Sequence, residues 1–177
     1  MEARSTAMAR ILGKSTKLKF NRVRFPIGDL TLNYIIMTQE QKQLLLVDLS
    51  ARLTYGVKAY VKNWSKLDRK YYEGVYTVES IHPSLNNILA YSDKFSVEVI
   101  VGYDDYEIKP YLFPLSSMTE EQKIIYGDLC YAVIRSLAWD TQAELNGLVD
   151  WLNSQHFDYR GLIEKGLAID CTNLNIY

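Results

Sequence analysis

A short stretch near the C-terminus, HFDYRGLIEKGLAI (residues 156–169), gathers histidine, aspartate, tyrosine, arginine, glutamate and lysine. His156 with Asp158, or His82 in their place, would supply a general base, and Cys130 would be the nucleophile that it activates. A thiolate nucleophile needs an exposed, electropositive setting beside its base. Cys130 instead lies within an apolar helical pattern. The sequence therefore favours a core cysteine over a catalytic one.

The residues of this stretch also have structural explanations. His156 ends a predicted helix, where an imidazole meets the last carbonyl groups. Asp158 is a natural N-cap for two further helical turns over 159–165, and Gly166 suits the left-handed position that ends them. We therefore expect the end of a fold rather than an active site. In this placement Leu162 and Ile163 face inward, and three charged residues face water: Arg160, Glu164 and Lys165.

No metal or cofactor site is predicted. The two histidines, His82 and His156, are 74 residues apart, and no cysteine or carboxylate cluster has the spacing of zinc ligands. The sequence also lacks a glycine-rich phosphate loop, a GxSxG motif and an HExxH motif. These observations predict a protein without a cofactor that is not an enzyme.

A second segment, YVKNWSKLDRKYYEG (60–74), interleaves aromatic and basic residues. Basic side chains neutralise phosphates while aromatic rings stack on bases, which is how small β-barrels hold single-stranded nucleic acid. Asp68 and Glu73 dilute the charge, and a solvated hairpin loop with aromatic anchors explains the pattern equally well. The candidate macromolecule-binding residues in this loop are Tyr60, Lys62, Trp64, Lys66, Arg69, Lys70 and Tyr72.

A protein partner is the alternative occupant. The chain has fourteen tyrosines, several in predicted connecting segments such as GYDDYE (102–107). Tyrosine offers a large, stiff, amphipathic contact surface at small entropic cost, so it is enriched at protein interfaces. We expect protein binding, with single-stranded nucleic-acid binding as the second hypothesis. The sequence does not identify the partner or the oligomeric state.

Composition and charge divide the chain in two. Its 177 residues, 48% of them hydrophobic, suffice for one domain with a real core. Residues 1–36 hold seven basic and two acidic residues, a net charge of plus five, so the remainder carries minus six. This basic extension is a disordered tail, a phosphate-binding arm, or the product of a start upstream of the usual one at Met37.

Targeting signals are not evident in the sequence. The N-terminal residues lack the apolar core and cleavage site of a secretory signal, and no apolar run approaches the roughly 18 residues of a membrane span. Two cysteines, Cys130 and Cys171, form no disulfide framework. These features predict a cytoplasmic protein with no membrane partner.

Residues 37–177 are predicted to form a single α+β domain. A helix over 38–54 precedes a β-rich region over 57–112 and a helical region over 119–166. Four or five short antiparallel strands, among them VYTVESI (75–81) and FSVEVIV (95–101), suggest a small antiparallel sheet or an SH3-like barrel. Pro110 and Pro114 predict an extended connector between the β-rich and helical regions.

Helix starts are marked by capping boxes, in which a threonine and a Gln or Glu three residues later satisfy each other's backbone amides. Thr38 with Gln41 begins the first helix, whose leucines at 45, 46, 49 and 53 form one apolar stripe, and Gly56 after it can take the left-handed cap. Thr119 begins a helix to about Ala138, with apolar residues at 125, 129, 133 and 137, and Thr141 begins a third.

Three segments, DLSARLTYGVKAYV (48–61), KPYLFPLSSMTEEQK (109–123) and HFDYRGLIEKGLAI (156–169), resemble a family of small uncharacterised proteins from gut Bacteroidales and their phages or mobile elements. The resemblance covers about residues 37–177. It implies the same plan of leading helix, variable β-rich middle, proline-bracketed connector and closing segment, and a start near Met37. Because the family has no known catalytic residue, substrate or cofactor, the resemblance implies a source and leaves the activity open. The combined expectation is a non-enzymatic accessory or adaptor protein that binds a host or phage macromolecule, with an anti-defence role as one form of it.

Overall fold

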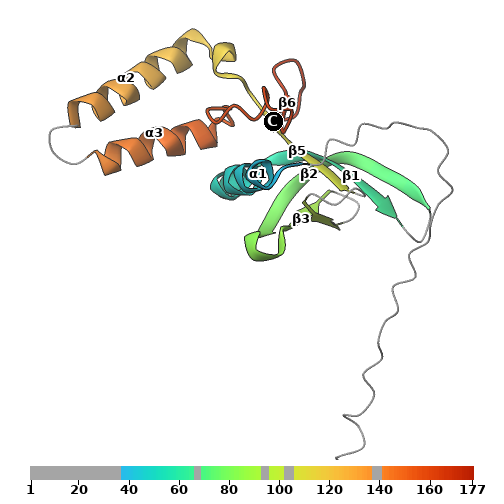
Figure 1. Ribbon diagram of the computed structural model, residues 1–177. Helices are drawn as coiled ribbons and strands as arrows, with labels where there is room; N and C mark the ends of the chain where they lie inside the picture. Colours follow the sequence, from blue (N-terminus) through green and yellow to red (C-terminus); the bar gives the residue numbers. More distant parts are fainter. Residues whose placement is uncertain (1–36, 66–68, 93–95, 102–105, 137–140) are drawn as a thin grey trace, which may run out of the picture. The chain divides into compact units, whose positions relative to one another are not determined.

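The computed structural model describes residues 37–65, 69–92, 96–101, 106–136 and 141–177, all within one compact unit, Tyr34–Tyr177. The predictions about residues 1–36 lie outside the described residues. The described part has a helix, five strands, two further helices and a short sixth strand, so the predicted α+β fold is confirmed (Figure 1).

Helix α1 (Gln39–Arg52) begins at its predicted capping box. The Gln41 backbone N–H donates to the Thr38 hydroxyl at 3.2 Å, and the Thr38 N–H donates to the Gln41 side chain at 2.9 Å. A single 3-10 turn, η2 (Leu53–Tyr55), follows, and Gly56 has the predicted left-handed conformation with φ of 65°. These local bonds set where α1 starts and where the chain turns toward the sheet.

The sheet contains strands β1 (Lys58–Ser65), β2 (Lys70–His82), β3 (Asn87–Tyr91), β4 (Ser96–Ile100), β5 (Tyr106–Leu112) and β6 (Ile169–Asp170). Their order across the sheet is β4-β3-β2-β1-β5-β6. All neighbouring pairs are antiparallel except β5 and β6, which are parallel. The sheet is therefore mixed and open, and the SH3-like alternative is wrong because β4 and β6 lie at opposite edges.

The main core lies between α1 and one face of the sheet, as Figure 1 shows. Alternation along β1 turns Ala59 and Val61 to this face, and both are buried. The leucine stripe of α1 packs on them, as its spacing predicted. The other fully buried side chains of this core include Leu45, Leu49, Val57, Ile88, Ala90, Val99, Leu112 and Leu162.

The predicted proline-bracketed connector is partly a strand. Pro110 lies inside β5, where it pairs with Ala59 of β1. The next ladder position would pair Lys58 with Tyr111, and the hydroxyl of Tyr177 fills it. This hydroxyl accepts a hydrogen bond from the Lys58 N–H at 3.1 Å and donates one to the Tyr111 carbonyl at 3.0 Å. A side chain distant in the sequence therefore continues the β1–β5 ladder.

Helices α2 (Glu120–Ser136) and α3 (Gln142–Ser154) lie side by side (Figure 1). The rings of Tyr126 and Trp151 stack with centroids 6.3 Å apart. A small second core of Met118, Leu152 and Phe157 connects this pair to the rest of the fold. α2 is the longest helix of the described residues, but residues 137–140, including the predicted end at Ala138, lie outside them.

Two helical predictions in the C-terminal third are wrong. Thr141 makes no side-chain hydrogen bond to the start of α3, so the third capping box does not form. Residues 159–166 form consecutive turns rather than a two-turn helix. Gly166 has the expected left-handed φ of 70°, and Leu167 N–H bonds back to the Leu162 carbonyl at 2.9 Å. The glycine-based ending was therefore correct, while the helix before it was not.

Candidate macromolecule-binding surface

The basic and aromatic segment 60–74 is a β-hairpin rather than the predicted long loop. β1 continues to Ser65 and β2 begins at Lys70, and the register pairs Trp64 with Tyr71. Lys66 lies outside the described residues, and Arg69 has a left-handed φ of 53° at the start of β2. The hairpin is extended because cross-strand aromatic and polar pairs stabilise strands as well as apolar pairs do.

Strand alternation separates the predicted binding residues into two groups. Tyr60, Lys62 and Trp64 point away from the α1 core, because Ala59 and Val61 between them are buried in it. Lys70 and Tyr72 belong to the opposite face of the sheet from this set, because Tyr72 pairs with Asn63 and Lys70 pairs with Ser65. Across the outer face, the partners on β2 are Val75, Glu73 and Tyr71. We call the six residues Tyr60, Lys62, Trp64, Tyr71, Glu73 and Val75 the hairpin platform.

The platform is held by contacts among its own members. The rings of Trp64 and Tyr71 lie 4.8 Å apart between centroids, at an angle of 58°. The Lys62 ammonium lies 4.7 Å from the centroid of the Tyr71 ring, a cation–π distance. The Tyr60 hydroxyl donates to the Glu73 carboxylate at 2.7 Å. Tyr71 and Val75 nevertheless remain exposed.

Charge on this face is balanced. Burial and the neighbouring Glu73 carboxylate raise the pKa of the Tyr60 hydroxyl above its usual range, so it stays a neutral donor. On β5, Glu107 and Lys109 pair at 2.9 Å beside β1. The outer face therefore offers aromatic area with alternating charges rather than a continuous basic strip.

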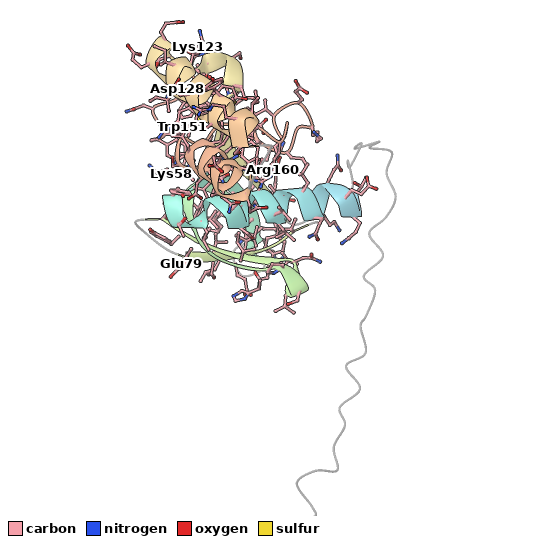
Figure 2. All side chains as sticks on the ribbon, turned by 90° about the vertical axis from the view of Figure 1, so that its left-hand side faces the viewer. Lys58, Glu79, Lys123, Asp128, Trp151 and Arg160 are labelled. Carbon is pink, nitrogen blue, oxygen red and sulfur yellow. The ribbon has the colours of Figure 1, made fainter. Side chains whose placement is uncertain are left out.

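The stretch 156–169 contributes one residue, the partly buried Arg160, to a charged cluster whose other members, Asp48 and Arg52, are buried on α1. The Asp48 carboxylate on α1 receives hydrogen bonds from Arg52 at 2.9 and 3.0 Å and from Arg160 at 2.8 Å. Arg52 also donates to the Phe157 carbonyl at 2.8 Å. Figure 2 shows Arg160 beside α1. The prediction that Arg160 faces water is wrong, whereas Glu164 and Lys165 are exposed as expected.

His156 has no catalytic partner in this arrangement. Its ring stacks on Tyr177 at a centroid distance of 3.9 Å, and its buried Nδ1 makes no hydrogen bond. Burial and the nearby Arg52 guanidinium lower the pKa of His156 to about 4, so the imidazole is neutral near pH 7. Both Asp158 oxygens accept backbone N–H groups, of Leu162 and Ile163, at 2.8 Å. Asp158 therefore holds the turns that follow it and is not the orienting carboxylate of a dyad, while its predicted role as a helix N-cap is wrong because no helix follows it.

The remaining candidates for chemistry are separate from this cluster. Cys130 lies partly buried on α2, outside both apolar cores, and His82 is exposed at the end of β2. Burial raises the pKa of the Cys171 thiol to about 11, which disfavours a thiolate. Among the described residues, no three His, Cys, Asp or Glu side chains converge as metal ligands would. No helix in the described part of the chain has the length and apolar character for a membrane crossing.

Two features of the structure were not predicted from the sequence. The first is the buried Asp48–Arg52 pair. Its i,i+4 spacing is typical of an ion pair on a helix, but such pairs are usually expected on an exposed helix face. The second is the outward side of α2, where Ile124, Tyr131 and Ile134 are exposed. The sequence predicted one apolar stripe along α2 beginning at Ile125, but Ile125 is itself 45% exposed and no described residue of α2 is buried.

Comparisons with protein-family models, with curated proteins and with solved structures found no match for this chain.

Proposed function

We propose that the protein is a non-enzymatic adaptor that binds a protein segment presenting apolar side chains to the hairpin platform. The observation that carries this proposal is the exposure of Tyr71 and Val75 beside Trp64 and Lys62 on an outer sheet face. Apolar and aromatic side chains gathered on an exposed face are typical of interaction sites. The charged members of the platform, Lys62 and Glu73, balance each other, so aromatic and apolar contact area rather than net charge carries the proposal.

The geometry favours protein over nucleic acid. Lys62 already covers the Tyr71 ring, and Trp64 packs against it, so a base would have to displace one of them in order to stack. Glu73 and Glu107 on the same face would repel phosphates. A protein partner meets neither obstacle, because its apolar side chains can cover the exposed edge of Tyr71 and it need not bring a negative charge to this face.

The same proposal includes the biological source of the protein and the compartment in which it acts. The resemblance of three segments to proteins of gut Bacteroidales and their phages or mobile elements supports an accessory role in such an element, in the cytoplasm of the host cell. An adaptor that engages a host protein would act there as an inhibitor or a recruiter. Interference with host defence is one such role, and it is supported by that origin alone.

The proposal is tested by capturing a binding partner from a lysate and measuring whether capture depends on the hairpin platform. Immobilised protein exposed to Bacteroidales lysate should retain a partner, and Tyr71→Ala should lose it. Tyr91→Ala is the matched control, since Tyr91 is exposed by 44% and Tyr71 by 48%. Tyr91 pairs with Thr77, six residues along β2 from Tyr71, which is about 20 Å away. With the purified partner, Tyr71→Ala should raise Kd at least about tenfold, and equal binding by Tyr71→Ala and the unaltered protein would refute the proposal.

Single-stranded nucleic acid is the second candidate, and the Trp64–Tyr71 ring pair beside Lys62 is the observation in its favour. It predicts that a labelled single-stranded oligonucleotide binds with an affinity that falls steeply as salt increases. Trp64→Ala should then abolish binding, and Lys62→Ala should reduce the salt dependence. If no oligonucleotide binds at low salt, this candidate is eliminated and the adaptor proposal remains.

A further inference from the structure

Helix α2 has a second apolar stripe on the side away from α3. Ile124, Tyr131 and Ile134 are 66%, 61% and 63% exposed, although they belong to a helix of 17 residues. At 100° per residue, these three and Gly127 lie within about 80° of one another around the helix. Gln122 and Tyr126 lie on the opposite side, where Gln122 contacts Gln155 just after α3 and Tyr126 contacts Trp151 of α3.

The spacing of this outward stripe is that of a helix–helix seam. Positions 124, 127, 131 and 134 follow the alternating three- and four-residue steps of a heptad repeat, and they span about 15 Å of helix. A methyl group added at Gly127 would meet no atom within 4 Å, so the surface there is open. Two bulky side chains on either side of an open glycine form a notch that can receive a ring.

The charges along α2 indicate the orientation of what covers it. Its first turn carries Glu120 and Glu121, and its last turn carries Arg135. A second α2 lying antiparallel would place Glu121 of one copy beside Arg135 of the other at both ends of the seam, with the two Asp128 carboxylates on the same flank at its middle. A parallel second copy would keep Glu121 and Arg135 at opposite ends of the seam, about 21 Å apart, so these pairs would not form. The helix dipoles also favour the antiparallel arrangement.

We propose that the protein self-associates through α2, with two copies of the helix packed antiparallel along the 124–134 stripe. In this register, Ile124 of one copy faces Ile134 of the second, and Tyr131 of each copy enters the notch at Gly127 of the other. Two Ile–Ile contacts, two Tyr–Gly contacts and two Glu121–Arg135 pairs then cover the stripe. This inference does not rest on the proposed function, because the hairpin platform is on other elements.

The first experiment measures the mass of the full chain in solution by sedimentation equilibrium over a range of concentrations. The unaltered protein should be a concentration-dependent dimer. Ile124→Glu should be monomeric, with the dissociation constant raised at least ~100-fold, because one substitution buries two unpaired carboxylates per dimer. Leu85→Glu is the matched control, since Leu85 is 67% exposed but lies in η3 (Pro83–Leu85), and it should dimerise normally.

The second experiment tests orientation by exchanging charges. Glu121→Lys alone and Arg135→Glu alone should each weaken dimerisation, because each creates two like-charge pairs. An equimolar mixture of the two variants should restore it as a heterodimer. One end of that heterodimer pairs the introduced lysine with the introduced glutamate, and the other end keeps the original Glu121–Arg135 pair. Gly127→Leu should fill the notch and prevent dimerisation while leaving the melting temperature of the monomer unchanged or raised.

Some results would overturn the proposal. A monomeric mass for the unaltered protein up to roughly 100 μM, where even weak interfaces associate, would eliminate it. A dimer that Ile124→Glu leaves intact would place the interface elsewhere, and a charge-exchange mixture that fails to associate would exclude the antiparallel register. Tyr71→Ala should dimerise normally, because Tyr71 is not on α2. The adaptor proposal is therefore tested by Tyr71→Ala, and the self-association proposal is tested by the α2 variants.

Discussion

Helices α1 and α2 begin with nearly the same six residues, MTQEQK at 37–42 and MTEEQK at 118–123. Both capping boxes form, with the same distances of 2.9 and 3.2 Å. Beyond these starts the helices differ completely. Five residues of α1 are buried, while no residue of α2 is. The same local signal therefore begins a core helix in one place and a largely exposed helix in the other.

The difference arises from what each helix contacts. α1 has the sheet on one side and the 156–163 segment on the other, which receives Arg52 at Phe157 and provides Arg160 to Asp48. α2 packs on α3 and keeps an apolar stripe exposed on its far side. A capping box establishes the first turn of a helix, but burial depends on the surfaces that meet afterwards. The predictions below test this contrast.

The largest expected effect comes from the buried charge on α1. Asp48→Ala leaves Arg52, which has no exposed side-chain surface, without its carboxylate, and should lower the free energy of unfolding by about 3–5 kcal/mol. Asp128→Ala, at an exposed position of α2 (Figure 2), should change it by no more than about 0.5 kcal/mol. Urea unfolding measures both. Equal losses of unfolding free energy for Asp48→Ala and Asp128→Ala would contradict the contrast between a core helix and an exposed helix.

Apolar truncation should give the same contrast on a slightly smaller scale. Leu49→Ala opens a cavity in the main core and should cost about 2–5 kcal/mol. Ile134→Ala removes exposed surface and should cost less than about 0.5 kcal/mol, provided that unfolding is measured at a protein concentration too low for self-association. A large loss for Ile134→Ala under that condition would show that α2 is buried within the monomer.

Lowering the pH should destabilise the fold around α1, because it protonates the buried His156. The pKa of His156 is lowered from 6.5 to about 4 in the folded protein, so folding favours the neutral ring. This contribution is complete above pH 6.5 and is lost as the pH falls toward 4, a change of about 3 kcal/mol. His156→Asn, which tolerates the left-handed φ of 58° at this position, should remove that part of the pH dependence of urea unfolding.

His82→Asn, at an exposed position, provides the control for this titration and should retain the full pH dependence. Hydrogen exchange adds the comparison between helices: between pH 7 and 4.5, protection should fall in α1, which contacts Phe157 and Arg160, more than in α2. Unchanged pH dependence in His156→Asn would assign the acid sensitivity to other groups.

The smallest effect should come from the caps themselves. Thr38→Ala and Thr119→Ala remove the same hydrogen bond, and each should cost about 1 kcal/mol. Loss of the α1 cap should appear as lower global stability, because α1 is part of the main core. Loss of the α2 cap should appear as faster amide exchange within α2 while the sheet keeps its protection. Identical exchange patterns for the two variants would contradict the contrast.

Features set by neighbouring residues could be predicted from the sequence. The capping boxes at Thr38 and Thr119, the left-handed Gly56 and Gly166 and the leucine stripe of α1 all form as expected. Each depends on hydrogen bonds or spacing within a few residues. Thr141 is the exception, since the same pattern there does not form the bond.

Predictions failed where a distant segment supplied the partner. Arg160 was expected in water because its carboxylate, Asp48, lies 112 residues away. The hairpin platform was expected in a loop because the Trp64–Tyr71 pairing depends on register. The barrel alternative depended on which strands become edges, and β6 joins the sheet from the far C-terminal end of the chain.

The amino-acid sequence was therefore sufficient for the α+β class, for the start of α1 and α2 and for the strands at 75–81 and 95–101, since these depend on interactions along the chain. Only the tertiary structure decided that Asp48 meets two arginines, that Tyr177 continues the β1–β5 ladder, and that α2 keeps a second stripe exposed. The physical reason is that burial and buried charge pairing are properties of two surfaces together. Neither surface carries that information in its own residues.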